Sequence, residues 1–198
     1  HHASGYSADT DSELREMLKH DNTVAVGECG LDFNRNYSSR QEQIRAFEAQ
    51  LEIAINLQKP VFLHQRDAHD DFIAIIKSCR NELPRLVAHC FTGNIDEVND
   101  FVLLDMYIGV TGWICDERRG ASLQRAVKHI PLDRLMLETD APYLLPRDLP
   151  TKPIKKNRNE PCYLPHIAQA VAKHMGLEED DLIAAAYQNS CDFFNLNC

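Results

Sequence analysis

The feature that most constrains the fold is a short apolar run that ends at a polar, chemically active residue and recurs five times along the chain. The runs lie at 24–27, 60–63, 86–88, 106–110 and 135–139, and they lead into Glu28, His64, His89, Thr111 and Asp140. Nearly every residue of these runs is apolar, which is typical of strands in a parallel sheet that is covered on both faces. Parallel strands end at the same edge, so the sequence predicts one edge lined with chemical side chains.

The segments between the runs have the spacing of amphipathic helices. In 41–57, for example, Ile44, Phe47 and Leu51 recur at intervals of three and four residues. We expect strands at 23–27, 60–63, 86–88, 106–111 and 135–139, and helices at 11–20, 41–57, around 72–79, 95–104, 122–129, 164–175 and 179–194. This alternation predicts an α/β fold built from strand–helix units.

Two architectures fit this order: an open doubly wound sheet and a TIM (β/α)8 barrel. A barrel normally needs about 250 residues and eight strands, whereas this chain has 198 residues and five predicted strands. The length therefore favours the open sheet. The chemical residues favour the barrel, because a barrel gathers all its strand ends on one rim, whereas an open sheet uses one switch point. We expect the barrel, with five of eight strands present and the first strands missing from this chain.

The composition limits the class of protein further. Hydrophobic residues make up 44% of the chain, which is enough for one core, so we expect a single domain over 1–198. No apolar run is long enough to cross a bilayer, and we expect no membrane partner. The seven cysteines are odd in number and scattered, which favours a reducing, cytoplasmic location. The net charge of −9 argues against general coating of nucleic acid, but it allows a local basic patch beside a metal ion.

The predicted strand ends bring together two imidazoles and two carboxylates, those of His64, His89, Glu28 and Asp140. On one rim, these side chains form a divalent metal site with nitrogen and oxygen ligands. Such a site lowers the pKa of bound water, and a remaining carboxylate can orient or deprotonate that water. A single histidine after a strand is more often a hydrogen-bonded core or loop residue. The same placement of all four residues favours the metal site. Glu138 would share a strand face with Asp140, as a support for the site or as an ordinary ion pair.

A second feature is the cluster of cations in two loops of an otherwise acidic chain. Arg118 and Arg119 follow the fourth predicted strand, and Arg158 lies in the long loop after the fifth. The same loop carries Lys152, Lys155 and Lys156, which a solvated charge run would explain equally well. The loops after the last two strands of a barrel often bind phosphate, and a planar guanidinium can bridge phosphate oxygens. We therefore expect Arg118, Arg119 and Arg158 to bind phosphate.

Six stretches of the sequence resemble the TatD family of metal-dependent deoxyribonucleases. They are GECGLDFNRN at 27–36, PVFLHQRDAHDDF at 60–72, AHCFTG at 88–93, YIGVTGWICDERRG at 107–120, LETDAPYLLPRDL at 137–149 and NRNEPCYLPHI at 157–167. These motifs are long, and the resemblance covers essentially the whole chain. CDERRG and RNEP place the sequence nearer to one branch of the family than to its more distant hydrolases.

The resemblance implies a TIM barrel of the metal-dependent hydrolase type and a Mg²⁺-dependent 3′–5′ exonuclease acting on single-stranded DNA or RNA. Mn²⁺ and Zn²⁺ are the alternative ions. It implies metal ligation by Glu28, His64 and His89, with Asp140 as ligand or base. By its distance from Glu28, His1 matches a further family histidine. The chain departs from the family pattern because the first strands, which carry additional ligands in many members, are absent. We expect a cytoplasmic monomer.

Two other functions remain open at this point. The same metal site could serve an amide or ester hydrolase, such as a deacylase acting on charged tRNA. Without its first strands, the chain could also be an inactive scaffold that only interacts with partners, since an unclosed barrel leaves strand edges and apolar faces exposed. Activity on an amide without nuclease activity would favour the first alternative, and failure to bind any divalent metal would favour the second.

Overall fold

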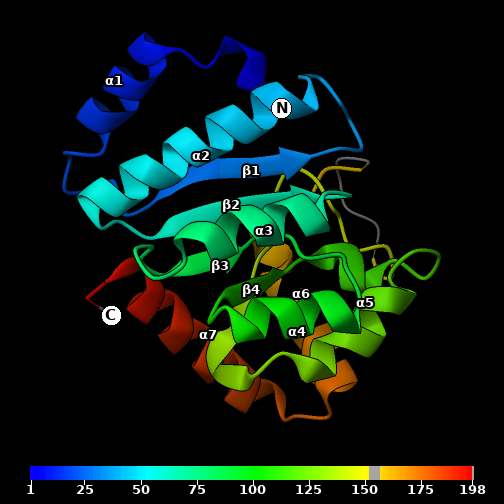
Figure 1. The fold of residues 1–198 in the computed structure, drawn as a ribbon. Helices are drawn as coiled ribbons and strands as arrows, with labels where there is room; N and C mark the ends of the chain where they lie inside the picture. The colour runs from blue at the N-terminus through cyan, green and yellow to red at the C-terminus, as the bar shows by residue number, and fades with distance from the viewer. Residues whose placement is uncertain (152–156, 198) are drawn as a thin grey trace. The chain divides into compact units, whose positions relative to one another are not determined.

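A computed structural model describes residues 1–151 and 157–197. The chain forms two compact units, one made of residues 1–88 and 193–195 and the other of residues 89–192 and the chain from 196 onward. Within the described residues, no helix is long and apolar enough to cross a membrane. Figure 1 shows the helices and strands of both units.

The first unit is built around three parallel strands, β1 (Val26–Asp32), β2 (Val61–Arg66) and β3 (Leu86–Ala88). β2 pairs with β1 on one side and with β3 on the other, where Val61 lies opposite Leu86. Helices α2 (Arg40–Leu57) and α3 (His69–Cys79) follow β1 and β2 and contact those strands, and α1 (Ala8–Met17) contacts α2 (Figure 1). These two strand–helix units are those expected from the alternating pattern.

The core of the first unit follows from the apolar spacing of the helices. Phe47 of α2 and Phe72 of α3 are fully buried, and their rings stack with centroids 5.4 Å apart. Helix α2 begins at a capping box, in which the Ser39 hydroxyl accepts a hydrogen bond from the Glu42 amide and the Glu42 carboxylate accepts one from the Ser39 amide. This reciprocal pair satisfies amides that an open helix end would leave without partners. By contrast, α1 has no buried residue.

The second unit holds two parallel strands, β4 (Tyr107–Val110) and β5 (Leu135–Leu137), which pair from Ile108 opposite Leu135 onward. Its helices are α4 (Ile95–Leu103), α5 (Ala121–Ala126), α6 (Leu164–Met175) and the greater part of α7 (Glu179–Phe194). Short 3-10 helices lie between them at Gly112–Cys115 (η2), Val127–His129 (η3), Leu132–Arg134 (η4) and Pro161–Tyr163 (η5). A fifth, η1 (Ala3–Gly5), lies in the first unit.

The side chain of Asn189 ties α7 to the start of β5. Its amide nitrogen donates to the carbonyl oxygens of Leu132 and Leu135, both at 2.8 Å.

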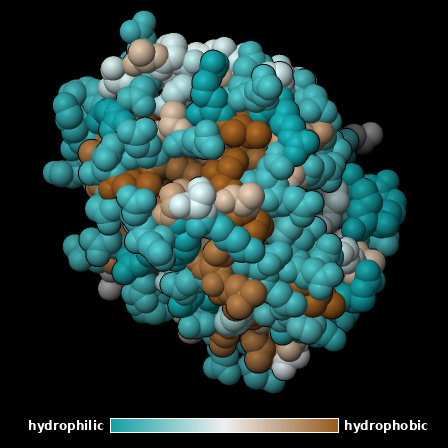
Figure 2. All heavy atoms as spheres, viewed as in Figure 1, coloured by the Kyte–Doolittle hydropathy of each residue, from teal (hydrophilic) through white to brown (hydrophobic). Residues whose placement is uncertain are grey.

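The described surface is mainly hydrophilic, with smaller apolar areas between the polar side chains on the face drawn in Figure 2. Cys29, Cys79, Cys90, Cys115 and Cys162 are free thiols, whereas Cys191 is disulfide-bonded, which differs from what the expected reducing location would favour.

The predicted elements are confirmed, with changes of boundary at three of the strands that carry the candidate site and at the first helix, which lies at Ala8–Met17 and not at 11–20. β1 runs to Asp32 and β2 runs to Arg66, so Glu28 and His64 lie inside their strands and not at the ends. β3 ends as predicted, because His89 follows it directly, whereas β5 ends at Leu137, two residues before the predicted end at 139, so that Asp140 lies in the loop three residues after the strand.

Candidate active site

A β-bulge in β1 positions Glu28. Gly27 pairs with Phe62 and Cys29 pairs with Leu63, so Glu28 is an extra residue with no counterpart on β2. A bulge bends the strand locally and can aim one side chain away from its regular direction. Glu28 Oε1 lies 2.8 Å from Nδ1 of His64 on the neighbouring strand. The two predicted ligands of the first unit are therefore in direct contact.

Asp32, at the end of β1, holds the other side of the His64 ring. Its Oδ2 lies 3.3 Å from His64 Nε2 and 3.4 Å from His1 Nε2. Its Oδ1 accepts hydrogen bonds from the amides of Asn34 and Arg35. These amides brace the loop after β1, and the contacts with His64 and His1 add Asp32 to the residues around the candidate site. One signal in the sequence could have revealed these contacts: Asp32 is a carboxylate only four residues after the predicted ligand Glu28.

The charge of Asp32 is preserved although its side chain is buried. Burial raises the pKa of this carboxyl, but the amide of Arg35, the His64 ring and the amide of Asn34 lower it by more, so the pKa lies below its usual value. Ligand atoms of His1, Asp32 and His64 all lie within 4.8 Å of one another. The first unit thus contains an ionised carboxylate and two imidazoles spaced closely enough to share one cation.

In the second unit, His89 is oriented by Glu138. His89 is buried, and its Nδ1 lies 3.0 Å from Glu138 Oε2. The other oxygen of Glu138 accepts from the amide of Cys90 at 3.4 Å. A carboxylate on Nδ1 fixes the orientation of the ring and leaves Nε2 as the nitrogen suited to a ligand. Of the two roles considered for Glu138, this contact favours the supporting one.

Gly109 of β4 makes room for the Glu138 carboxylate. A Cβ atom at this position would lie 1.5 Å from Glu138 Oε1. We expect Gly109→Ala to displace Glu138, to release the His89 ring, and to weaken divalent-metal binding about 10–100-fold, as loss of a supporting carboxylate does. A calorimetric titration with Mn²⁺ measures this change in affinity. Gly5→Ala is the control, since an added Cβ there meets nothing within 4 Å. Equal affinities in the two variants would contradict the role of Glu138.

Asp140 lies in the loop after β5, in the left-handed region with φ of +55°. Asn159 stabilises this turn, because its side-chain nitrogen donates to the carbonyl of Thr139 at 2.6 Å and its own amide donates to the carbonyl of Pro142. Asn159 is 1% exposed. Asn159 lies in the NRNEPCYLPHI motif, but the sequence alone does not reveal its role, because its partner Thr139 is 20 residues away along the chain.

The two arginines after β4 are held by a buried carboxylate. Asp116 accepts from the amides and guanidinium groups of Arg118 and Arg119. Burial raises the pKa of Asp116, but the hydrogen bonds from Arg118 and Arg119 outweigh that effect and hold the pKa far below its usual range. The Arg119 guanidinium also lies 4.2 Å from the centroid of the Trp113 ring. Both arginine side chains remain more than half exposed and can still reach a ligand.

The remaining basic residues differ in what the structure says of them. Arg158 is half exposed, and its Nε lies 3.7 Å from Glu160 Oε1. Lys152, Lys155 and Lys156 lie outside the described residues.

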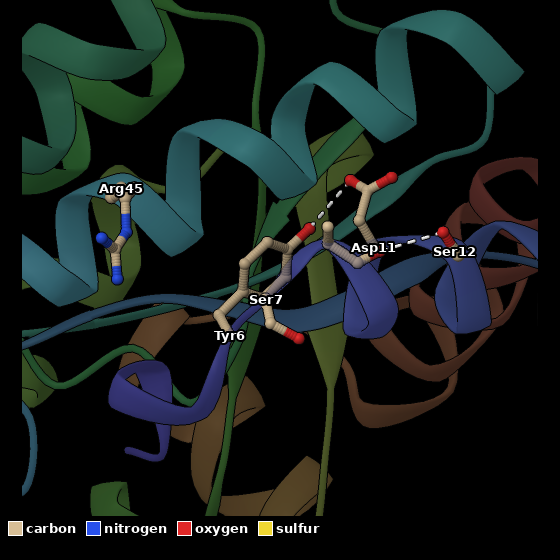
Figure 3. Close-up of a pocket in the computed structure, with 6 residues that line it drawn as sticks. Tyr6, Ser7, Asp11, Ser12 and Arg45 are labelled. Atoms are coloured by element: carbon tan, nitrogen blue, oxygen red, sulfur yellow. Dashed lines mark hydrogen bonds between the residues drawn. The ribbon is translucent and has the colours of Figure 1, made fainter.

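A cavity of about 460 Å³ between α1 and α2 contains no predicted site residue. Figure 3 shows Tyr6, Ser7, Asp11, Ser12 and Arg45 around it, with the Tyr6 hydroxyl directed at Asp11.

Comparison with known proteins gives a consistent result. The model of the family described as TatD related DNase matches residues 1–195. Curated relatives include the 3′-5′ ssDNA/RNA exonuclease TatD of Erwinia billingiae (strain Eb661), which is 50% identical over 196 residues, or 99% of this chain and 75% of the relative. The protein of the same name from Erwinia amylovora (strain ATCC 49946 / CCPPB 0273 / Ea273 / 27-3) is 51% identical with the same coverage.

Solved structures agree. The TatD homolog YjjV from Escherichia coli K12 superposes with a TM-score of 0.82 at 28% identity, over 98% of this chain and 73% of that one. A hydrolase TatD family protein from Entamoeba histolytica gives a TM-score of 0.83 at 26% identity, over 96% of this chain and 68% of that one. With these neighbours, the parallel strand–helix units confirm the expected TIM-barrel fold class. The chain belongs to the TatD related DNase family.

Proposed function

We propose that this protein is a metal-dependent 3′–5′ exonuclease that hydrolyses the phosphodiester bonds of single-stranded DNA or RNA. The observation that carries the proposal is the contact of Glu28 with one nitrogen of His64 while Asp32 contacts the other. Relatives at 50% identity, named as 3′-5′ ssDNA/RNA exonucleases, supply the substrate class. The proposal includes a cytoplasmic monomer, as expected from the sequence.

We propose Glu28, His64, His89 and Asp140 as the metal ligands, with His1 as a further one. The donors are all nitrogen and oxygen, which suits Mg²⁺, Mn²⁺ or Zn²⁺, and Mg²⁺ is the ion we propose. The fit rests on the 2.8 Å contact of Glu28 with His64 and on the preserved charge of Asp32. When bound, the ion supplies Lewis-acid stabilisation of the phosphoryl oxygens and a bound water of lowered pKa.

The surrounding residues supply orientation and proton transfer. Asp32 fixes the His64 ring through Nε2, and Glu138 fixes the His89 ring through Nδ1. We assign to Asp140 the acceptance of the proton from the attacking water, because a carboxylate in a loop at the strand ends can act as a general base. Asn159 holds the backbone next to Asp140 through the carbonyl of Thr139.

The arginines bind the nucleic acid. Asp116 holds Arg118 and Arg119, and their exposed guanidinium groups present planar sets of donors that match phosphate oxygens. Arg158 is the neighbour in sequence of Asn159, which holds the turn at Asp140. Its ion pair with Glu160 is loose, at 3.7 Å, and can yield to a stronger anion. We assign Arg158 to the phosphate nearest the scissile bond.

Replacing Arg158 is expected to weaken substrate binding more than catalysis. We expect Arg158→Ala to raise KM about tenfold, because one charge-assisted contact to phosphate is worth about 1.5 kcal/mol. Arg158→Lys should recover only part of this, since a lysine cannot bridge two oxygens. The measurement is steady-state cleavage of an oligonucleotide at low and at high salt. An unchanged KM in Arg158→Ala would exclude the residue from the site.

The proposal is tested against its hydrolase rivals by substrate class. The full chain with Mg²⁺ is given a single-stranded DNA oligonucleotide, an RNA oligonucleotide, a duplex and an aminoacylated tRNA, and products are followed over time. We expect stepwise shortening from the 3′ end of both single strands and little release of amino acid from the tRNA. Deacylation without shortening of any strand would overturn the nuclease assignment in favour of an amide or ester hydrolase.

A further inference from the structure

A second cluster of metal-ligating side chains lies in the second unit, apart from the residues assigned above. Ligand atoms of Cys115, Asp148 and His166 all lie within 4.8 Å of one another. His166 Nε2 and Asp148 Oδ1 are 2.7 Å apart. None of the three has a part in the proposed nuclease chemistry. The sequence alone gives no reason to group them, because they are 33 and 18 residues apart along the chain.

The three residues come from three different segments. Cys115 ends the 3-10 helix η2, which is capped by the Thr111 hydroxyl accepting from the Trp113 amide. Asp148 belongs to the loop between β5 and η5, and His166 lies in the first turn of α6. An ion held by all three would therefore fix the loop to two other elements of the same unit.

The burial of the cluster is graded from the interior to the solvent. Cys115 is 5% exposed, the side chain of His166 is 21% exposed and that of Asp148 is 54% exposed. A sulfur at the bottom and a carboxylate at the surface leave the cluster accessible from outside. An ion can enter past the carboxylate without opening the core.

We propose that Cys115, Asp148 and His166 bind a borderline-soft divalent ion of the Zn²⁺ type, with a water molecule as the fourth ligand. Cysteine sulfur, histidine nitrogen and aspartate oxygen are each ligands that zinc takes in proteins. Tetrahedral zinc at the usual bond lengths places its ligand atoms roughly 3.3–3.8 Å apart, so small side-chain rotations are enough to close this cluster around an ion. A thiolate selects against Mg²⁺, which prefers oxygen, so this site differs in its choice of ion from the proposed catalytic one.

Binding requires the loss of one proton. Burial raises the pKa of the Cys115 thiol to about 12, and the Asp148 carboxylate adds to the effect. The thiol is therefore protonated near neutral pH. When the ion binds, a metal–sulfur bond forms, the S–H bond breaks and one proton passes to the solvent. Binding of the ion therefore strengthens as the pH rises, because the thiolate is the form that acts as ligand.

The raised pKa of the Cys115 thiol also argues against a nucleophilic role for this cysteine. An activated cysteine has a lowered pKa and an exposed sulfur, whereas Cys115 has a raised pKa and is buried. His166 directs a ring nitrogen to Asp148, as a ligand pair does in the absence of an ion. Metal binding is the use that these three side chains share.

The site would steady the loop beside the arginines assigned to phosphate. Arg147, next to Asp148, has its Nε 3.4 Å from Glu117 and 3.9 Å from Asp116. Asp116, next to Cys115, holds Arg118 and Arg119. The ion would fasten both segments at neighbouring residues. This role is structural and does not depend on which substrate the enzyme cleaves.

Cobalt provides a direct test, because only a thiolate ligand gives the near-ultraviolet sulfur-to-cobalt charge-transfer band. The full chain is titrated with Co²⁺ alone, as wild type and as the variants His64→Ala, Cys115→Ser, His166→Gln and Cys162→Ser. We expect the band in the wild type, in His64→Ala and in Cys162→Ser. We expect its loss in Cys115→Ser and at least tenfold weaker binding in His166→Gln.

Two outcomes would overturn the proposal. One is the absence of the band in folded wild-type protein, and the other is its persistence in Cys115→Ser. His166→Gln tests the site without changing the buried Cys115, and because His166 is partly exposed this substitution should not disturb folding. Circular dichroism of each variant shows that the fold is retained. If the nuclease proposal were wrong, the band would be unaffected, so the two failures can be told apart.

Discussion

Replacing Glu28 by glutamine lowers metal-dependent cleavage at least about 10³-fold if the site has the role assigned to it. The variant keeps the size of the side chain but removes the charge that lies 2.8 Å from His64 Nδ1. The change weakens binding of the ion about 10–100-fold and, with the ion, removes the activation of the attacking water, an effect typically worth about 10²-fold or more. Glu28 is 48% exposed in its side chain, so the fold should tolerate the change. Single-turnover cleavage of a labelled oligonucleotide measures it.

Glu48→Gln is the matched control for this prediction. Glu48 carries the same carboxylate on the exposed side of α2, so its loss should leave the rate within about twofold of the wild type. A second readout is Mn²⁺ affinity, which should fall in Glu28→Gln and not in Glu48→Gln. A Glu28→Gln protein that cleaves within about threefold of the wild-type rate would contradict the assignment.

Gly30→Ala is expected to destabilise the protein by about 4 kcal/mol, the largest single effect on stability that the structure predicts. Gly30 has φ of +149°, and a Cβ there would lie 1.9 Å from the carbonyl oxygen of His64 on the paired strand. The clash is with backbone, so no side chain can rotate to relieve it. β1 and β2 would have to separate beneath Glu28 and His64. The midpoint of urea unfolding measures the loss.

Gly176→Ala separates the clash from the backbone conformation. Gly176 ends α6 in the left-handed region with φ of +72°, and an added Cβ meets nothing within 4 Å. This variant should cost only about 1 kcal/mol, the usual penalty for a side chain in that conformation. If Gly30→Ala were no more destabilising than Gly176→Ala, the close approach of β1 and β2 would not be a determinant of stability.

Most of the fold can be predicted from the sequence because the spacing of apolar residues differs clearly between its strands and its helices. Continuous apolar runs mark the parallel strands, and the three-and-four spacing of residues such as Phe47 and Leu51 marks the helices. The ends of α6 and α7 agree with the predicted 164–175 and 179–194. The single domain over 1–198 stays a prediction.

The sequence predicts the candidate site by residue type but not by geometry. A bulge changes no residue type, so the apolar pattern of β1 gives no sign that Glu28 lies within the strand and is an extra residue there. The sequence pattern also does not single out Asp32, because the predicted first strand ends at 27, whereas β1 continues to Asp32 and brings this residue into contact with His64. The link of Glu138 to His89, 49 residues away, requires a tertiary contact that local spacing does not specify.

The most direct test of the central claim follows the release of the 3′-terminal nucleotide from a single-stranded oligonucleotide that carries its label there. The full wild-type chain and His64→Ala are each assayed with Mg²⁺ and with excess chelator. We expect release by the wild type with Mg²⁺, and its loss with chelator or in the variant. Release that survives the chelator, or that His64→Ala sustains at the wild-type rate, would contradict the assignment of a metal-dependent nuclease centred on His64.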